Sequence, residues 1–171
     1  MPLTLYDISV PVFTRMLRQL SHILKVGEDW AKEKGIPESQ VMSVRLYEDM
    51  QPLAYQVQRV SDTMKFAAVR VGGVEAPSFQ DTETTWAELH DRIKATMEFL
   101  ESVPKDAIAG KEDAEVIQRT PTGAERKYTG SSYLLVFAIP NAAFHVSIAY
   151  ALLRHQGVPV GKMDYLGSLP Q

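Results

Sequence analysis

The feature that most constrains the fold is a long run without charge towards the C-terminal end. The 21 residues from Tyr133 to Leu153 contain no Asp, Glu, Lys or Arg. A run of this length can cross a membrane as a helix. It also carries Pro140, Asn141, His145 and Ser147, and the other helical patterns of the chain are amphipathic. We therefore interpret it as a helix buried partly in a protein core and partly at a subunit interface, and we expect no membrane partner.

Three further segments have apolar residues at helical spacing: Val10–Lys34, Pro52–Val71 and Thr85–Val103. Glycines at 35 and at 72–73 follow the first two, and glycine suits the exit of a helix. The third begins with Thr85-Trp86-Ala87-Glu88, the spacing of a capping box. With the charge-free run as the fourth helix, these segments predict an all-α chain, residues 1–171, folded as one four-helix bundle.

The connection between the third and fourth helices is long and breaks the helical pattern. Its turn sequence, Thr120-Pro121-Thr122-Gly123, separates Glu115–Arg119 from Arg126–Thr129, which predicts a small two-stranded ribbon. We expect Ser131 or Ser132 to cap the fourth helix, and we expect an extended tail, Gly157–Gln171, packed across the bundle.

Composition excludes several kinds of site. The chain has no cysteine, which rules out disulfides, a thiolate nucleophile and zinc sites that need cysteine ligands. The net charge is −3, with both signs interspersed along the chain, so we expect no nucleic-acid partner. The first residues show no basic segment followed by an apolar one, and we expect a cytoplasmic protein.

Four polar residues are candidates for one inward pocket. Asn141 and His145 lie one turn apart on the same side of the fourth helix. Gln56 lies at the edge of the apolar face of the second helix, and Asp49 falls near it if the helical phase continues back past Pro52. A carboxylate, two amides and an imidazole together can bind a small polar molecule, or give a metal an incomplete site.

Each of these residues also has a structural interpretation. His145 can be a hydrogen-bonded core histidine, because buried polar groups need partners. Asn141 can satisfy backbone groups freed by Pro140, and Asp49 can cap the second helix. Asp62 and Lys65 are predicted to lie on the solvated side of the same helix.

Four segments together resemble a bacterial domain-of-unknown-function family that is grouped with the DinB-like (YfiT-like) metalloenzymes. They are LYDISVPVFTRMLRQLSHIL, DMQPLAYQVQRVSDTMK, SFQDTETTWAEL and PNAAFHVSIAYALLRHQGVPVGKMDYLG. The resemblance covers essentially the whole chain and implies a four-helix bundle of DinB-like topology, often a homodimer.

The resemblance also implies where a metal would bind. DinB-like members hold a divalent metal with one histidine from the second helix and a His-x-x-x-His pair from the fourth. Here His145 matches the first histidine of the pair, but Ala149 stands four residues later, and the second helix has Gln56 in the matching region. We therefore expect no metal cofactor, with His145 as the one candidate ligand.

These observations leave three hypotheses for function. The first is a bundle that binds a small polar ligand near His145 without an intact three-histidine site. The second is a divergent metal-dependent hydrolase or transferase that uses His145 with Asp49 or Gln56. The third is a structural or interaction protein whose apolar fourth helix serves association, and we expect a homodimer through that helix.

Overall fold

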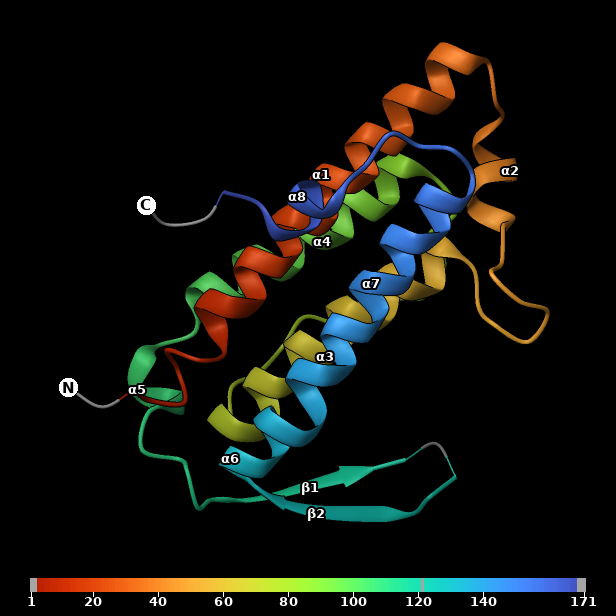
Figure 1. Cartoon of the computed structure of the whole chain (residues 1–171). Coiled ribbons are helices and arrows are strands. Elements are labelled where there is room, and N and C mark those ends of the chain that lie inside the picture. Colours follow the sequence, from red (N-terminus) through yellow and green to blue (C-terminus); the bar gives the residue numbers. More distant parts are fainter. Residues whose placement is uncertain (1–2, 121, 169–171) are drawn as a thin grey trace.

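Four long helices run along one another in the computed structural model, which describes residues 3–120 and 122–168 (Figure 1). The long helices are α1 (Val10–Lys34), α3 (Leu53–Gly72), α4 (Trp86–Ser102) and α7 (Ile139–His155). The shorter helical segments are α2 (Glu38–Ser43), α5 (Lys105–Ile108), α6 (Gly130–Ser132), η1 (Tyr133–Ala138) and α8 (Lys162–Leu166). Besides these helices the structure has one small antiparallel sheet of two strands. The chain is therefore mostly helical.

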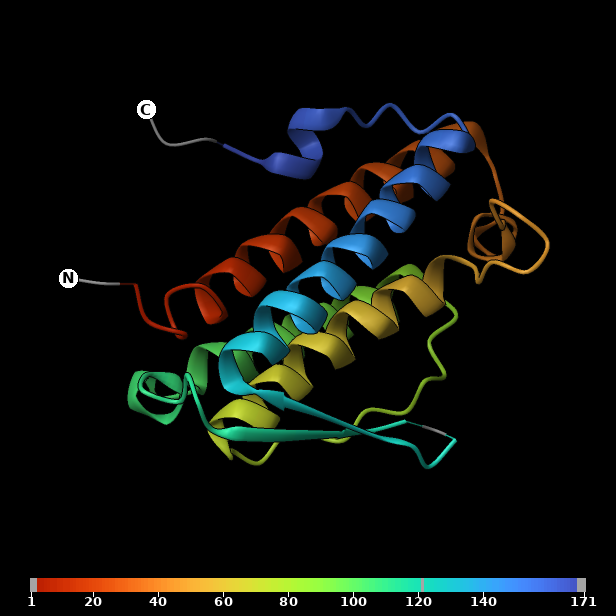
Figure 2. The same ribbon diagram turned by 60° about the horizontal axis from the view of Figure 1, so that its bottom comes forward.

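The long helices contact one another in a ring around a shared apolar core. Helix α1 contacts α4 and α7, and α3 contacts the same two helices. Figure 2 shows α1 and α7 on one side, with α3 and α4 on the other. The centre of the ring is filled by side chains at helical spacing, among them Leu20, Ile23, Val57, Leu89 and Leu152, all fully buried.

Local sequence signals explain where the first helices begin and end. Gly35 has a φ of 65°, and its N–H bonds the carbonyls of the last turn of α1. Helix α4 starts with the predicted capping box: Thr85 Oγ1 accepts from the Glu88 N–H, and the Glu88 carboxylate accepts from the Thr85 N–H.

The predicted ribbon is present as strands β1 (Glu115–Arg119) and β2 (Glu125–Thr129), paired antiparallel from Glu115 opposite Thr129 to Arg119 opposite Glu125. Strand β1 contacts α3 and strand β2 contacts α6, and the hairpin lies beside α6 and one end of α3 (Figures 1 and 2). Val116 is the buried anchor of β1. Of the predicted turn, Pro121 lies outside the described residues.

The last long helix starts earlier than expected. Its cap is Thr129, whose Oγ1 accepts from the Ser132 N–H, so the expected cap at Ser131 or Ser132 is wrong. Helix α6, the π-helical segment η1 and α7 then follow without a break. The π-helical segment η1 has wider turns than an α-helix and directly precedes Pro140. Proline lacks an N–H, and its ring would clash with a carbonyl of the preceding turn in a regular α-helix.

The continuous helix Gly130–His155 is long and apolar enough to cross a membrane by length and composition, and 28% of its most apolar window is buried. Its inner side packs into the core with residues such as Ala142, Val146 and Ala149. On its outer side, Leu135, Val136 and Phe144 are 56, 69 and 55% exposed. This helix therefore presents an apolar outer face.

The tail after α7 is not wholly extended as predicted, because α8 forms within it and packs on α1. Arg15 of α1 donates to the carbonyls of Leu166 and Ser168, at 2.8 and 3.0 Å. Residues 169–171 of the predicted tail lie outside the described residues.

Candidate functional site

A pocket of about 330 Å³ opens between α3 and α7, with η1 and β1 at one end. It combines aromatic side chains, two arginines, one carboxylate and several neutral polar groups. Its lining consists of Tyr55, Arg59, Asp62, Thr63, Phe66, Arg70, Gln118, Phe137, Asn141 and His145. A few polar groups among aromatic walls are the usual composition of a small-molecule site.

Three hydrogen bonds join α3 to the last long helix along this pocket. Gln56 bonds His145 at 2.7 Å, Thr63 bonds Asn141 at 2.8 Å, and Arg70 bonds Tyr133 at 2.6 Å. The three residues of α3 are spaced seven apart, so they share one side of that helix. Because the two helices run in opposite directions, the residue numbers of the partners fall, from His145 to Asn141 to Tyr133, as those on α3 rise.

The bond to Gln56 selects one tautomer of His145. Gln56 is 3% exposed, and its Nε2 donates to the carbonyl of Gln51 at 2.7 Å. Its Oε1 therefore faces His145 as an acceptor, so Nδ1 of the imidazole carries the hydrogen and donates. In the neutral ring this leaves Nε2 with a free lone pair, as the nitrogen that can accept a hydrogen bond from a ligand.

The surroundings keep this imidazole neutral. Burial, and after it the nearby positive charge of Arg59, lowers the pKa of His145 to about 4. The rings of Tyr55 and Phe144 lie edge-on to the imidazole, at centroid distances of 6.2 and 5.2 Å. At neutral pH His145 is therefore an uncharged hydrogen-bonding group in a partly aromatic setting.

The structure places two of the four predicted pocket residues, Asn141 and His145, in the pocket lining, and Gln56, which is not a lining residue, bonds His145. Gln56, Asn141 and His145 lie along one line of contacts, and the side-chain amide of Asn141 donates to Thr63 rather than to backbone freed by Pro140. Asp49 is not among them: it lies in an exposed turn and does not line the pocket. Nor does it cap α3, whose N-terminal cap position is Pro52, without a side-chain bond.

Asp49 lies outside the pocket because the helix on which its predicted position depends does not reach it. A proline disfavours helical backbone at the residue before it, so the helical phase of α3 does not extend back through Gln51. Helix α3 begins only at Leu53.

A cluster of charged residues adjoins the pocket, where the sequence predicted solvated side chains. Lys65 is 4% exposed and pairs with Asp62 at 3.2 Å. Asp62 also accepts from Arg59 and from the buried Arg92, both at 3.0 Å. Around this core the cluster adds Asp81, which pairs with Arg59 and Arg92, and Glu83, which pairs with Arg92 at 2.7 Å.

The prediction of a solvated Asp62 and Lys65 is therefore wrong. The segment before α4 folds back over α3, and the ring of Phe79 lies 4.6 Å from the Lys65 ammonium and 5.2 Å from the Arg92 guanidinium. Helical periodicity alone does not indicate that a loop covers this side of α3.

Several pocket residues were not identified from the sequence: Tyr55, Arg59, Thr63, Arg70 and Gln118. A usable signal exists for two of them. Thr63 and Arg70 repeat the position of Gln56 at intervals of seven, which predicts a shared face. Gln118 reaches the pocket from the hairpin, and no pattern in the sequence indicates where that hairpin docks.

The residues present do not fit the three-histidine metal centre that the resemblance implies. At the position of the second histidine of the pair, Ala149 is fully buried. On α3 the matching group is the Gln56 amide, whose oxygen already accepts from His145. Within residues 3–120 and 122–168, no three His, Cys, Asp or Glu side chains cluster closely enough to hold a metal ion.

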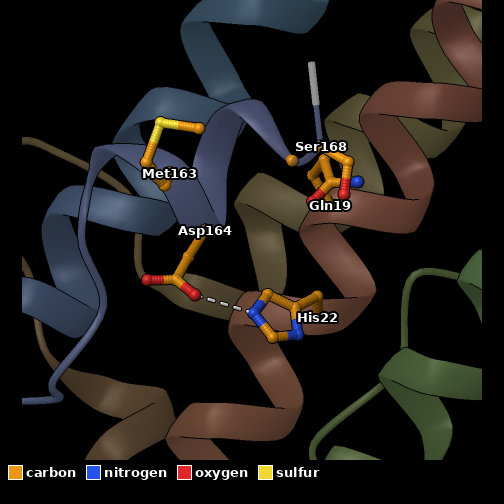
Figure 3. A pocket seen from close by; sticks show the side chains of 6 residues that line it. Gln19, His22, Met163, Asp164 and Ser168 are labelled. Atoms are coloured by element: carbon orange, nitrogen blue, oxygen red, sulfur yellow. Dashed lines mark hydrogen bonds and ion pairs between the residues drawn. The ribbon is translucent and has the colours of Figure 1, made fainter. Parts of the chain in front are cut away.

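A second, larger pocket of about 510 Å³ lies between α1 and α8. Figure 3 shows His22 and Asp164 joined across it, with Gln19 and Ser168 together at one end. His22 Nε2 lies 2.8 Å from Asp164 Oδ1, and the other carboxylate oxygen accepts from the Gly161 N–H at 2.7 Å. Bonds from Gly161 and His22 lower the pKa of Asp164. The bond between His22 and Asp164 attaches α8 to α1, and the bond from Gly161 caps the start of α8, so both groups have structural roles that need no ligand.

Comparison with known proteins agrees with this architecture. Residues 5–166 match the family described as "Domain of unknown function (DUF1993)". The crystal structure of a DinB family member protein from Shewanella denitrificans is 37% identical and covers 98% of this chain and 94% of its own, with a TM-score of 0.89. No curated protein matches. The chain therefore belongs to the DUF1993 family of domains of unknown function and is related to the DinB family.

Proposed function

We propose that this protein binds a small polar ligand in the pocket beside His145 and has no high-affinity metal. The observation that carries the proposal is the hydrogen bond between Gln56 and His145, which leaves Nε2 of a neutral imidazole as an acceptor. Asn141, Thr63 and Gln118 add neutral polar groups to the same pocket, and Tyr55, Phe66 and Phe137 add apolar walls. We also propose that the long helices form a four-helix bundle of DinB-like topology, supported by their ring of contacts.

A fragment screen tests the binding proposal. A panel of small polar molecules is measured by ligand-observed NMR with the wild-type protein, His145→Ala, Asn141→Ala and the control His155→Ala. His155 is exposed in the last turn of α7 and does not line the pocket. We expect fragments that bind wild type and the control but lose at least fivefold in affinity in both pocket variants. A panel whose binders are unaffected by both pocket variants would contradict the proposal.

The rival function is a divergent metal-dependent hydrolase or transferase. Zinc sites ordinarily use three or more protein ligands, and here the hydrogen-bonded neighbour of His145 on α3 is the Gln56 side-chain amide. We expect purified protein to lose added zinc or nickel to a chelator. Retention of near one equivalent, abolished by His145→Ala, would favour the rival.

We further propose that two copies associate through the outer face of the last long helix. The support is its exposed apolar side chains, Leu135, Val136 and Phe144, on a helix without charged residues from Tyr133 to Leu153. Exposed apolar groups that lie on one helix are typical of an interaction surface, and a twofold axis is the simplest way for copies of one chain to cover it.

A further inference from the structure

The end of the pocket opposite His145 has a distinct chemistry, set by Arg70. Arg70 lies in the last turn of α3, and its Nη1 donates to the hydroxyl of Tyr133 at 2.6 Å. Its guanidinium lies over the ring of Phe66 at 4.9 Å and near that of Tyr133 at 5.7 Å. The rings of Phe66 and Tyr133, together with the hydroxyl of Tyr133, hold the guanidinium of Arg70 in one orientation.

Arg70 differs from the neighbouring cations in having no carboxylate partner among the residues that the structure describes. Arg59, Lys65 and Arg92 each pair with Asp62. The other two carboxylates of the cluster, Asp81 and Glu83, are also used by these cations. The charge of Arg70 is therefore not balanced locally.

The whole region consequently carries an excess of one positive charge. Its cations are Arg59, Lys65, Arg70 and Arg92, and its carboxylates are Asp62, Asp81 and Glu83. Asp62 is the single carboxylate that lines the pocket, and its two oxygens accept from three cations. A negative group entering beside Arg70 meets an unpaired guanidinium and no uncompensated carboxylate in the lining.

We propose that the ligand of this pocket is a small organic anion, with its carboxylate or phosphate at Arg70 and its apolar body along Phe66 and Phe137. This inference rests on the proposed function, because it assigns a ligand class to the same pocket. A planar guanidinium matches both oxyanions with paired hydrogen bonds. His145 Nε2, at the other end, accepts a hydrogen bond from a hydroxyl or amine of a longer ligand.

The test compares an anion with its neutral isostere. Phenylacetate, phenylacetamide and phenyl phosphate are titrated by NMR into wild type, Arg70→Gln, and the control Arg18→Gln. Arg18 is an exposed residue of α1 that pairs with Glu101 away from the pocket. We expect phenylacetate to bind wild type and the control at least fivefold more tightly than phenylacetamide. In Arg70→Gln we expect this ratio to approach one while the affinity for phenylacetamide changes less than twofold. Phenyl phosphate ranks the two oxyanions against each other.

The outcomes separate the anion inference from the binding proposal. Equal binding of phenylacetate and phenylacetamide by wild type, or a preference that survives Arg70→Gln, would overturn the anion inference. If other fragments still bind and depend on His145, the proposed function stands without it. If Arg70 only stabilises the end of α3, Arg70→Gln alters folding without altering the ratio, which also counts against the inference. Should that variant fail to fold, wild type is titrated from 20 to 500 mM NaCl. The inference then requires the ratio to fall with salt, and a ratio independent of salt overturns it.

Discussion

At the scale of single residues, His145 is both a structural group and a pocket group. Its Nδ1 satisfies the buried oxygen of Gln56, its Nε2 has no hydrogen-bond partner among the residues that the structure describes, and the ring lines the pocket. The two interpretations considered for this residue therefore apply to different nitrogens of one ring. This division predicts that removing the ring and replacing it with another donor will have different consequences.

The His145 side chain should make stability depend on pH. Because the folded state lowers its pKa to about 4 from the ordinary value of 6.5, the unfolded chain binds more protons between these values. The stabilisation is complete above pH 6.5 and is lost as pH falls towards 4. We expect a loss of about 1–2 kcal/mol for this partly exposed group, after allowing for solvent screening.

Urea denaturation of wild type, His145→Gln and His145→Ala at pH 7.5 and 4.5 measures this effect. The glutamine can still donate to Gln56 but does not titrate, so the difference between wild type and His145→Gln should shrink at the lower pH. His145→Ala leaves the Gln56 oxygen unsatisfied, and we expect it to cost about 1–3 kcal/mol at pH 7.5. A cost below about 0.5 kcal/mol for the alanine variant would show that the bond to Gln56 is not structural.

At the scale of elements, the start of the last long helix depends on close packing against the preceding loop. The N–H of Gly130 donates to the Ala114 carbonyl at 2.9 Å, and that of Ser131 to the Glu112 carbonyl at 3.0 Å. A Cβ at position 130 would collide with the carbonyl oxygen of Lys111. Backbone cannot move aside as readily as the end of a flexible side chain can.

We therefore expect Gly130→Ala to destabilise the protein by about 2–4 kcal/mol, because it overpacks a helix start whose N–H groups are already bonded. Thermal or urea unfolding measures the loss. The matched control is Ser131→Ala, at the residue that follows Gly130. A Gly130→Ala variant as stable as wild type would show that this loop does not pack on the helix as described.

Helix positions followed from the sequence where apolar spacing and end signals agreed. Helix α1 begins and ends as expected, from Val10 to Lys34, because a regular apolar face runs into a glycine exit. The prediction for the last long helix is less accurate, because a constant 3.6-residue period cannot represent the wider π-helical turn of η1 before Pro140. Of the residues at the candidate site, the sequence predicts those that lie on regular helix: Asn141 and His145, which line the pocket, and Gln56, which bonds His145. Residues brought in by loops and the hairpin, such as Gln118, carry no such periodicity.

At the scale of the whole molecule, the outer face of the last long helix exposes apolar side chains to solvent. Val136 and Phe144 are more than half exposed there. If this face joins two copies, replacing both residues with polar ones should separate them without disturbing the inward side of the helix. We expect light scattering to give a dimer mass for wild type at micromolar concentration and a monomer mass for Val136→Ser/Phe144→Ser. A monomeric wild type would contradict the association proposal.

The protonation state of His145 is the most direct test of the central claim that this ring offers an unprotonated Nε2 to a ligand. Long-range ¹H–¹⁵N NMR of labelled protein distinguishes the two ring nitrogens, and loss of the signals in His145→Gln assigns them. At pH 6 we expect a neutral ring with hydrogen on Nδ1, and a shift of the Nε2 resonance when a pocket fragment binds. A protonated ring, hydrogen on Nε2, or an Nε2 resonance that no bound fragment alters would contradict it.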